Sequence, residues 1–151
     1  MNRGKQFEQD FKNSFDKDTY IYRLRDSANS WSNNDNSRFT TTNICDFIIY
    51  KNPYLLLAEL KETKGKSLTI SRIRKNQYEG LKKAIGYQNM NPILVVLFSD
   101  INECYKLDWE YVVEFIEKAE RKSIPIEYIR DKGTRIGIEQ KRTRYRYTGV
   151  V

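Results

Sequence analysis

Two carboxylates and a lysine lie in neighbouring apolar segments of the chain, and their spacing suits metal-dependent hydrolysis. Asp46 lies within ICDFIIY (44–50), and Glu59 and Lys61 lie within YLLLAELK (54–61). Both segments are strand-like, and the intervening KNP sequence predicts a hairpin turn. Because alternate side chains of a strand share a face, Glu59 and Lys61 should project from the same side.

The hairpin register determines which side chains face each other. If Tyr50 pairs with Leu55, the same antiparallel register places Asp46 opposite Glu59, with Cα atoms about 4.5–5.5 Å apart. Two like charges at this distance are destabilising unless a cation compensates, and Mg²⁺ prefers carboxylate oxygens and water. With the ammonium of Lys61 beside it, such a metal could activate water and stabilise charge on a phosphate. The spacing therefore indicates phosphodiester hydrolysis with Mg²⁺, for which Mn²⁺ could substitute.

The same residues also have a purely structural interpretation. An Asp and a Glu-x-Lys sequence could form a solvated strand face with a surface ion pair, and E-x-K occurs often by chance. Leu55 and Leu57 lie on the predicted face of Glu59, which favours burial, and unpaired charges are rare in buried positions. A different loop length would separate Asp46 from Glu59, so the register decides between the two interpretations.

Periodicity elsewhere predicts the elements that must position these strands. Helices are predicted over 4–15, 71–87 and 109–121, and strands over 19–24, 44–50, 54–61, 92–98 and 124–129. The run ILVVLF is typical of a central buried strand, whereas Pro125 favours an edge position for the last one. Ser71 is the predicted cap of the second helix. The order predicts a single α/β domain over 1–151, with a mixed central sheet flanked by helices.

Two segments fall outside this regular pattern. Residues 25–43 are rich in Ser, Asn, Thr and Asp, which predicts a long polar loop or a protruding element. Trp31 and Phe39 in this loop could wedge into unstacked DNA or anchor the loop to the core. The basic tail, 130–151, is either a disordered end or a strand whose tyrosines and arginines lie on opposite faces. The arginines in question are Arg142, Arg144 and Arg146.

Composition narrows the chemistry further. The 151 residues include 27 Lys and Arg, 20 Asp and Glu and no histidine, for a formal net charge of +7. Without histidine, Ser-His-Asp and Cys-His catalysis and the usual zinc sites are excluded. The positive charge points to a polyanionic partner, and its alternative role is solubility alone. Cys45 and Cys104 lie in apolar stretches, which predicts buried thiols in a reducing cytosol, and neither a signal peptide nor a membrane span is apparent.

Positive charge is concentrated directly after the predicted site. The segment 61–83 contains only Glu62 and Glu79 as acids, and its alternative interpretation is a solvated helix face. We expect phosphate contacts from its basic residues and from the tail: Lys64, Lys66, Arg72, Arg74, Lys75, Arg142, Arg144 and Arg146.

These residues resemble a known nuclease signature. Asp46 followed by the ELK sequence at 59–61 resembles the PD-(D/E)XK motif. The fuller resemblance is to RecU-type Holliday junction resolvases of Gram-positive bacteria and their phages. Residues 2–8 are similar to that family's R-G-x-x-(F/L)-E helix, and ELKETK is similar to its E-A-K-E-T-K run. Thr41 and Thr42 are similar to its S-T-T-D segment, although three residues intervene before Asp46.

The resemblance, which covers about residues 2 to 129, implies a restriction-endonuclease-like core. In that core Asp46 and Glu59 bind Mg²⁺, and Lys61 lies at the scissile phosphate. It also implies roles for residues outside the strands: Glu8, Gln77 and Thr42 in support of the site, and Arg3 in DNA binding. By their own sequence context, Glu8 is an exposed helical acid spaced to pair with Lys12, and Gln77 is an ordinary polar helix residue.

The family implies a homodimer and a stalk between the first strands, for which residues 25–43 would form a shorter version. We therefore expect a cytoplasmic, Mg²⁺-dependent, structure-selective endonuclease that resolves four-way DNA junctions, in a bacterium or in the host of a phage. One alternative is a PD-(D/E)XK nuclease that cuts duplex or other branched DNA without junction selectivity. Another is a non-catalytic DNA-binding or inhibitory protein, which the intact set of Asp46, Glu59 and Lys61 disfavours.

Overall fold

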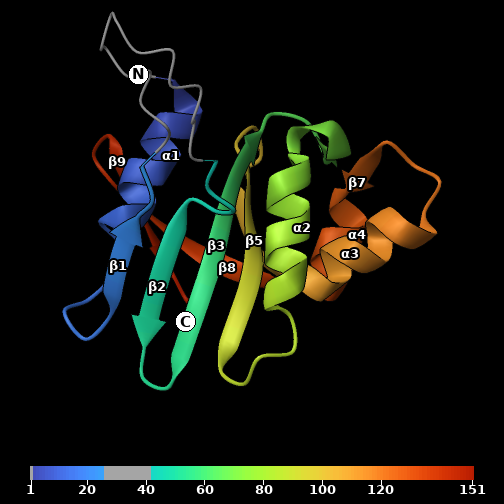
Figure 1. Ribbon diagram of the computed structural model, residues 1–151. Coiled ribbons are helices and arrows are strands. Elements are labelled where there is room, and N and C mark those ends of the chain that lie inside the picture. The colour runs from blue at the N-terminus through green and yellow to red at the C-terminus, as the bar shows by residue number, and fades with distance from the viewer. Residues whose placement is uncertain (1, 26–41) are drawn as a thin grey trace, which may run out of the picture.

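A curved mixed sheet with helices on both faces forms the body of the molecule (Figure 1). The computed structural model describes residues 2–25 and 42–151. The predictions for most of the polar loop, including those for Trp31, Phe39 and Thr41, lie outside the described residues.

The main sheet has seven strands in the order β1-β2-β3-β5-β6-β8-β9. These strands are β1 (Tyr20–Arg23), β2 (Phe47–Lys51), β3 (Tyr54–Thr63), β5 (Met90–Phe98), β6 (Glu103–Asp108), β8 (Thr134–Lys141) and β9 (Arg144–Thr148). β3 and β5 run parallel, and the other neighbouring pairs are antiparallel. A separate two-stranded sheet pairs β4 (Ser67–Thr69) with β7 (Ser123–Pro125). The predicted mixed α/β fold is confirmed.

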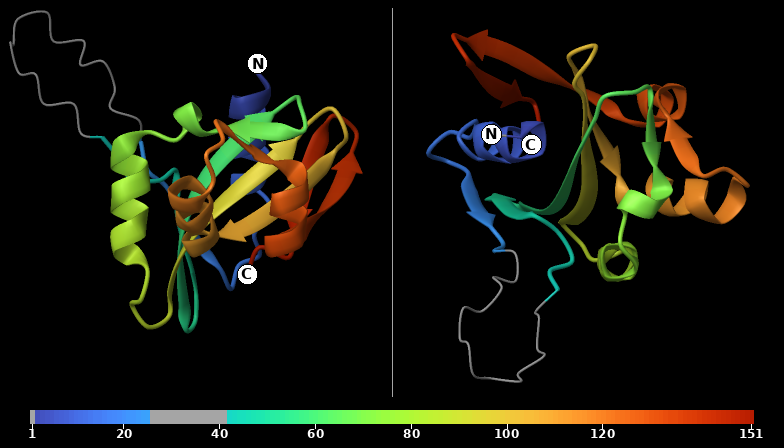
Figure 2. Two further views of the ribbon diagram at one scale, coloured as in Figure 1. Left: turned by 90° about the vertical axis from the view of Figure 1, so that its right-hand side faces the viewer. Right: turned by 90° about the horizontal axis from the view of Figure 1, so that it is seen from above.

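The helices cover the two faces of the sheet unequally (Figure 2). They are α1 (Arg3–Lys12), α2 (Lys75–Ala84), α3 (Trp109–Lys118) and α4 (Ile126–Lys132). α1 begins at Asn2, whose side chain accepts a hydrogen bond from the Lys5 N–H at 2.8 Å. The apolar stripe of α1 buries Phe7 and Phe11 against one face, and α2 and α3 pack on the other face.

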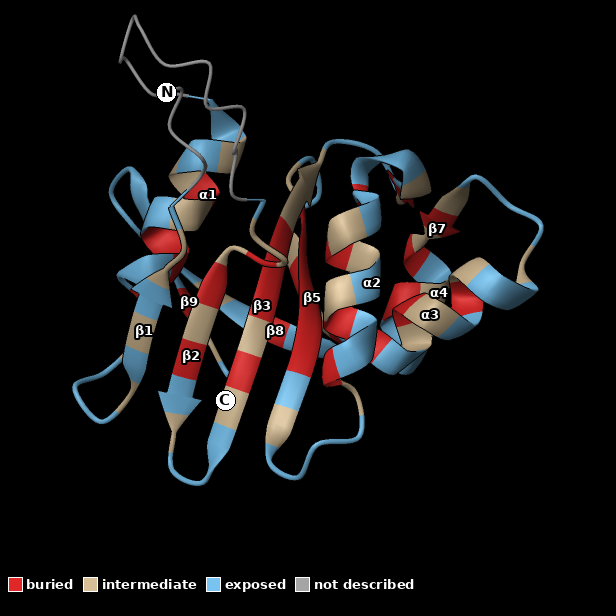
Figure 3. Cartoon of the chain, viewed as in Figure 1, coloured by how far each residue is buried: buried red, intermediate tan, exposed pale blue. Residues whose placement is uncertain are grey.

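The apolar side chains form two cores, one on each side of the sheet. Alternate residues of β3 divide between them, because Leu56, Ala58 and Leu60 pack with α1 whereas Leu57 packs on the α2 side. The ILVVLF segment of β5 is buried throughout and lies at the centre of the sheet, as the sequence predicts. Figure 3 shows this strand buried along most of its length, whereas the residues of β1 alternate between exposed and intermediate.

The register of the β2–β3 hairpin confirms the sequence-based prediction. Tyr50 pairs with Leu55, and the ladder extends from Lys51–Tyr54 to Phe47–Ala58. The strand is nevertheless shorter than predicted, because residues 44–46 precede it instead of belonging to it. Asp46 therefore lies just beyond the last pair of the ladder, next to the strand that carries Glu59.

One predicted strand and one predicted helix cap are wrong. The segment 124–129 is not one strand, because Pro125 ends β7 and stands at the N-cap of α4. Ile126 and Ile129 are both fully buried at helical spacing, which the alternating strand interpretation overlooked. Ser71 does not cap α2; it lies in a 3-10 turn (Ile70–Arg72), and Arg74 occupies the N-cap.

Strand β6 and the tail complete the sheet beyond β5. β6 was not predicted, because its Lys106 and the polar residues before it weaken the strand pattern, while pairing with β5 and β8 stabilises it. The tail forms the β8–β9 hairpin and is not a disordered end. In β9 the arginines are exposed, and Tyr147 is buried against Phe7 and Phe11 of α1, so its ring belongs to the core.

Candidate active site

Asp46 is held in place by the backbones of both neighbouring strands. Its N–H donates to the Ala58 carbonyl at 3.0 Å, and its carbonyl accepts from the Leu24 N–H at 2.8 Å. Its carboxylate Oδ2 accepts from the Leu60 N–H at 2.8 Å, where a further β2 residue would otherwise supply a backbone acceptor. The end of the ladder thus turns the Asp46 side chain towards β3, beside Glu59.

Glu59 is the centre of a buried polar cluster. The residue is 1% exposed, and its Oε1 accepts from the Lys61 ammonium at 2.7 Å and from the Gln77 amide at 2.8 Å. Its other oxygen, Oε2, is buried and makes no hydrogen bond within the described part of the chain. A buried carboxylate oxygen without a donor is costly, so this atom is a natural position for a cation.

The electrostatics of the two carboxyl groups are coupled. Burial, and then the charge of Asp46, raise the pKa of Glu59 to about 7. Burial also raises the pKa of Asp46, with the Leu60 N–H opposing it and the charge of Glu8 adding to it. Burial and the two nearby carboxylates raise the pKa of the Cys45 thiol to about 12, so this sulfur is inert at neutral pH.

Gln77 is oriented from both ends of its side-chain amide. Its Oε1 accepts from the Arg74 N–H at 3.0 Å at the start of α2, and its Nε2 donates to Glu59. The residue is 5% exposed, so the geometry is fixed by packing as well as by hydrogen bonds. The structure brings Gln77 into the cluster, where its sequence context alone suggested only a polar helix residue.

Glu8 reaches the site from α1, on the other side of the sheet. It forms an ion pair with Arg23 and not with the predicted Lys12; the Arg23 Nε donates to Glu8 at 2.9 Å. Its charge is close enough to Asp46 to raise the pKa of that carboxyl. Arg23 was not among the predicted site residues, and its position at the end of a short strand preceding the polar loop was the only available signal.

The segment before Asp46 is packed tightly against α2. The Asn76 side chain donates to the Asn43 carbonyl at 3.0 Å. A Cβ atom built on Gly80 would lie 2.3 Å from a methyl of Ile44, so only glycine permits this approach. Thr42 lies exposed at the start of this segment. These contacts couple the position of Asp46 to that of Gln77 on the same helix.

The carboxyl groups fit a hard divalent cation. No group of three or more Asp, Glu or Cys side chains in residues 2–25 and 42–151 could hold a metal ion. Mg²⁺ is commonly bound by only one or two protein carboxylates, with water and substrate phosphate completing its shell. The Oε2 atom of Glu59, which accepts no hydrogen bond, and the neighbouring Asp46 carboxylate can supply these two protein ligands. Both carboxyl groups lose their protons more readily when a cation is bound.

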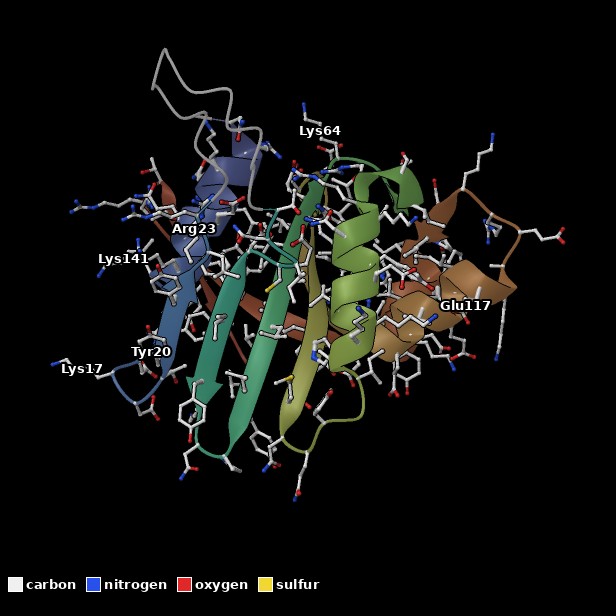
Figure 4. All side chains as sticks on the ribbon, viewed as in Figure 1. Lys17, Tyr20, Arg23, Lys64, Glu117 and Lys141 are labelled. Carbon is white, nitrogen blue, oxygen red and sulfur yellow. The ribbon has the colours of Figure 1, made fainter. Side chains whose placement is uncertain are left out.

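The basic residues after Glu59 surround the same end of the sheet. The side chains of Lys64 and Lys66 are exposed in the turn after β3, and Figure 4 shows Lys64 extending away from the sheet. Arg72, Arg74 and Lys75 are also exposed. The positive charge of Arg74 acts on Glu59 and lowers its pKa, although less than burial raises it.

The tail arginines are farther along the opposite face, where two of them hold α1 and the turn after it to the β8–β9 hairpin. Arg144 pairs with buried Asp10 at 2.7 Å, and Arg146 pairs with Asp16 at 3.0 Å. Arg3 and Arg142, which are distant in sequence, line one cleft of about 470 Å³ between α1 and this hairpin. The structure thus gives Arg144 and Arg146 structural partners and brings Arg3 and Arg142 together.

The fold and the cluster together define a restriction-endonuclease-like domain with PD-(D/E)XK-type residues. A family model described as Recombination protein U (RecU) matches residues 2–149, and the chain belongs to the RecU family. The SPbeta prophage-derived uncharacterized protein YotM of Bacillus subtilis (strain 168) is 27% identical over 164 residues, which cover 97% of this chain and 82% of that protein. Within the described ranges, no helix is long and apolar enough to cross a membrane.

Proposed function

We propose that this protein is a Mg²⁺-dependent endonuclease that cuts DNA at the cluster of Asp46, Glu59 and Lys61. The observation that carries the proposal is the buried Glu59, whose Oε2 lacks a donor while Asp46 and Lys61 lie against it. A carboxylate kept in this condition by a fold that also supplies a lysine is expected to serve chemistry. Membership of a family of recombination proteins supports DNA as the substrate.

Each side chain of the cluster has a distinct task in this reaction. Asp46 and Glu59 would hold Mg²⁺, or Mn²⁺ in its place, which when bound acidifies water and stabilises charge on the phosphate. The Lys61 side chain is 13% exposed, and its ammonium is placed to stabilise the negative charge that develops during phosphodiester cleavage. Gln77 holds Glu59 in one orientation, and Glu8 with Arg23 supports Asp46 from α1.

The surrounding charge supports a polyanionic substrate approaching this end of the sheet. Lys64, Lys66, Arg72, Arg74 and Lys75 are exposed around the cluster, and the whole chain carries a net charge of +7. We propose that the preferred substrate is a four-way junction. We also propose that a homodimer acts on the junction, because resolution of a two-fold symmetric junction requires a pair of symmetric cuts. Membership of a family of recombination proteins supports the junction proposal.

The substrate is tested by comparing cleavage of matched DNAs. We expect Mg²⁺ to promote nicking of a labelled four-way junction, with slower cutting of a linear duplex that contains the same arm sequence. Equal rates on both would contradict junction selectivity and favour a nuclease for general duplex DNA. If no DNA is cut with either Mg²⁺ or Mn²⁺, the result would contradict the nuclease proposal and favour a non-catalytic DNA-binding protein.

A further inference from the structure

Three exposed tyrosines lie on a part of the sheet that none of the helices in residues 2–25 and 42–151 covers. Tyr20, Tyr22 and Tyr50 are 60%, 47% and 44% exposed. Tyr20 pairs with Tyr50 across β1 and β2, and Tyr22 follows two residues along β1, so the three rings project from the same face. In Figure 1 none of the labelled helices stands in front of this face of β1 and β2, whereas α2 stands over the neighbouring part of the sheet. We call these three residues the tyrosine face.

The tyrosine face is continuous with the proposed active site. Asp46, Ile48 and Tyr50 alternate along one side of the chain, and Tyr50 pairs with Leu55 of β3. Glu59 shares that side, because it has the parity of Leu55 along β3 and contacts Gln77 of α2. At about 3.3 Å per residue, the level of Tyr22 is about 7 Å from Asp46 along the strands, and Tyr50 is about 13 Å away.

The chemistry of this surface suits bases better than phosphates. Between the carboxylates and the hairpin turn, the side chains on this side of β1–β3 are all uncharged: Tyr20, Tyr22, Ile48, Tyr50, Leu55 and Leu57. Exposed tyrosine rings stack on nucleic-acid bases, and stacking needs bases that are not already paired within a duplex. The Tyr50 hydroxyl donates to Asn52 at 3.4 Å, which leaves the ring itself available.

The size of the surface also favours bases over a protein partner. Four residues of β1 span about 13 Å, and three strands span about 10 Å, so the area is roughly 130 Å². A stable protein interface buries about 800 Å² on each partner, several times this area. One or two unstacked bases, in contrast, match these dimensions, and the net charge of +7 attracts their backbone.

We propose that the tyrosine face binds unpaired DNA bases, so that one or two nucleotides next to the scissile phosphate are held out of the helix. This inference rests on the proposed nuclease function, because the bound bases would belong to the DNA strand that leads away from the cleavage site. It adds a requirement that the DNA be unpaired or readily unpaired at that position.

Binding to single-stranded DNA without metal tests this proposal separately from cleavage. The affinity of the full chain for a labelled oligothymidine and for a blunt duplex is measured in EDTA by fluorescence anisotropy. We expect Tyr20→Ala, Tyr22→Ala and Tyr50→Ala each to weaken oligothymidine binding at least about fivefold. Tyr→Phe at the same positions should retain the affinity, and duplex binding and its salt dependence should not change. The control is Tyr54→Ala, which removes a ring that is 47% exposed on the opposite side of β3.

Three results would overturn the proposal. Unchanged oligothymidine affinity in all three alanine variants would show that the rings do not contact bases. An equal loss in Tyr54→Ala would show that the effect is not specific to this face. A fall in the solution mass of the alanine variants, measured by light scattering, would identify the face as a contact between copies of the chain. Because no metal is present, a wild type that binds in this way but never cuts DNA would contradict only the proposed function.

Discussion

Glu59 is a destabilising residue for the metal-free protein. Its side chain is almost fully buried, one of its oxygens lacks a donor, and Asp46 adds a second negative charge. Lys61 and Gln77 compensate for part of this through Oε1. A residue that a fold retains at such a cost is a candidate for function, and the cost itself can be measured.

The pH dependence of stability should report this cost. The pKa of Glu59 rises from 4.5 to about 7 on folding, so the folded state binds more protons than the unfolded state between these values. The free energy of unfolding should therefore fall as the pH rises from about 4.5 to about 7, by roughly 3 kcal/mol. Denaturant unfolding across this range checks it, with Glu59→Gln as the comparison. The two proteins should differ in the slope of this profile; parallel profiles would contradict the buried charge.

Gln77 should matter for metal affinity more than for folding. Replacing it with methionine keeps its volume but removes the hydrogen bond to Glu59, so the carboxylate loses its fixed orientation. Loss of a residue that hydrogen-bonds to a metal ligand typically costs about 10- to 100-fold in metal affinity or activity. We therefore expect the dissociation constant for Mg²⁺ to rise by about this factor. Titration calorimetry measures it, and exposed Gln88→Met is the matched control. Unchanged Mg²⁺ affinity would remove Gln77 from the site.

At the scale of elements, the site depends on the close contact between α2 and the segment that precedes β2. Gly80 allows Ile44 to approach the helix, and Asn76 bonds to the Asn43 carbonyl on the same surface. Since α2 also carries Gln77, a shift of this helix would move one wall of the cluster relative to Asp46. These contacts between elements thus contribute to the geometry of the candidate active site as well as to the core.

Gly80→Ala should reduce stability and disturb the site together. Its Cβ would lie 2.3 Å from one Ile44 atom and 2.8 Å from the Ile44 Cβ, so the helix or the segment must move. We expect a loss of about 1–3 kcal/mol in denaturant unfolding, despite the better helix propensity of alanine. Gly4→Ala is the matched helical control, because its Cβ would meet the nearest atom at 3.7 Å and should be neutral or stabilising. Equal effects in the two variants would contradict the close contact.

The sequence predicts this structure correctly where the local hydrophobic pattern and the tertiary environment favour the same secondary structure. Alternation and turn chemistry gave the β2–β3 register, and with it the neighbourhood of Asp46 and Glu59. Pairing with β5 and β8 makes β6 a strand despite its weak pattern, and buried Ile126 and Ile129 make α4 a helix. The Glu8–Arg23 pair joins elements that only tertiary packing brings together, so no spacing rule could identify it.

At the scale of the whole molecule, some basic side chains form ion pairs within the fold, and others are exposed near the carboxylates. Arg144 and Arg146 pair with acids of α1 or of the turn after it and hold the C-terminal hairpin. Lys64 and Lys66, in contrast, are exposed at the end of β3 near the carboxylates. The net charge of +7 is therefore an incomplete guide to DNA binding, and position decides which cations contribute.

The salt dependence of duplex binding should separate these two groups of side chains. If Lys64 and Lys66 each neutralise a phosphate, the Lys64→Ala/Lys66→Ala variant should lower the slope of log affinity against log salt by about 1.8. Fluorescence titrations at several salt concentrations in EDTA give the slope. Lys118→Ala, which removes an exposed side chain of α3 that pairs with Glu114, should leave the slope unchanged. An unaltered slope in the double variant would place the DNA elsewhere.

Single-turnover cutting of a four-way junction tests most directly whether Asp46, Glu59 and Lys61 form a Mg²⁺-dependent cleavage site. The rate is followed against Mg²⁺ concentration for the wild type and for Asp46→Asn, with junction binding in EDTA as the folding control. We predict that Asp46→Asn binds the junction normally and cuts at least about 100-fold more slowly at saturating Mg²⁺. Cutting by Asp46→Asn at the wild-type rate would contradict the account.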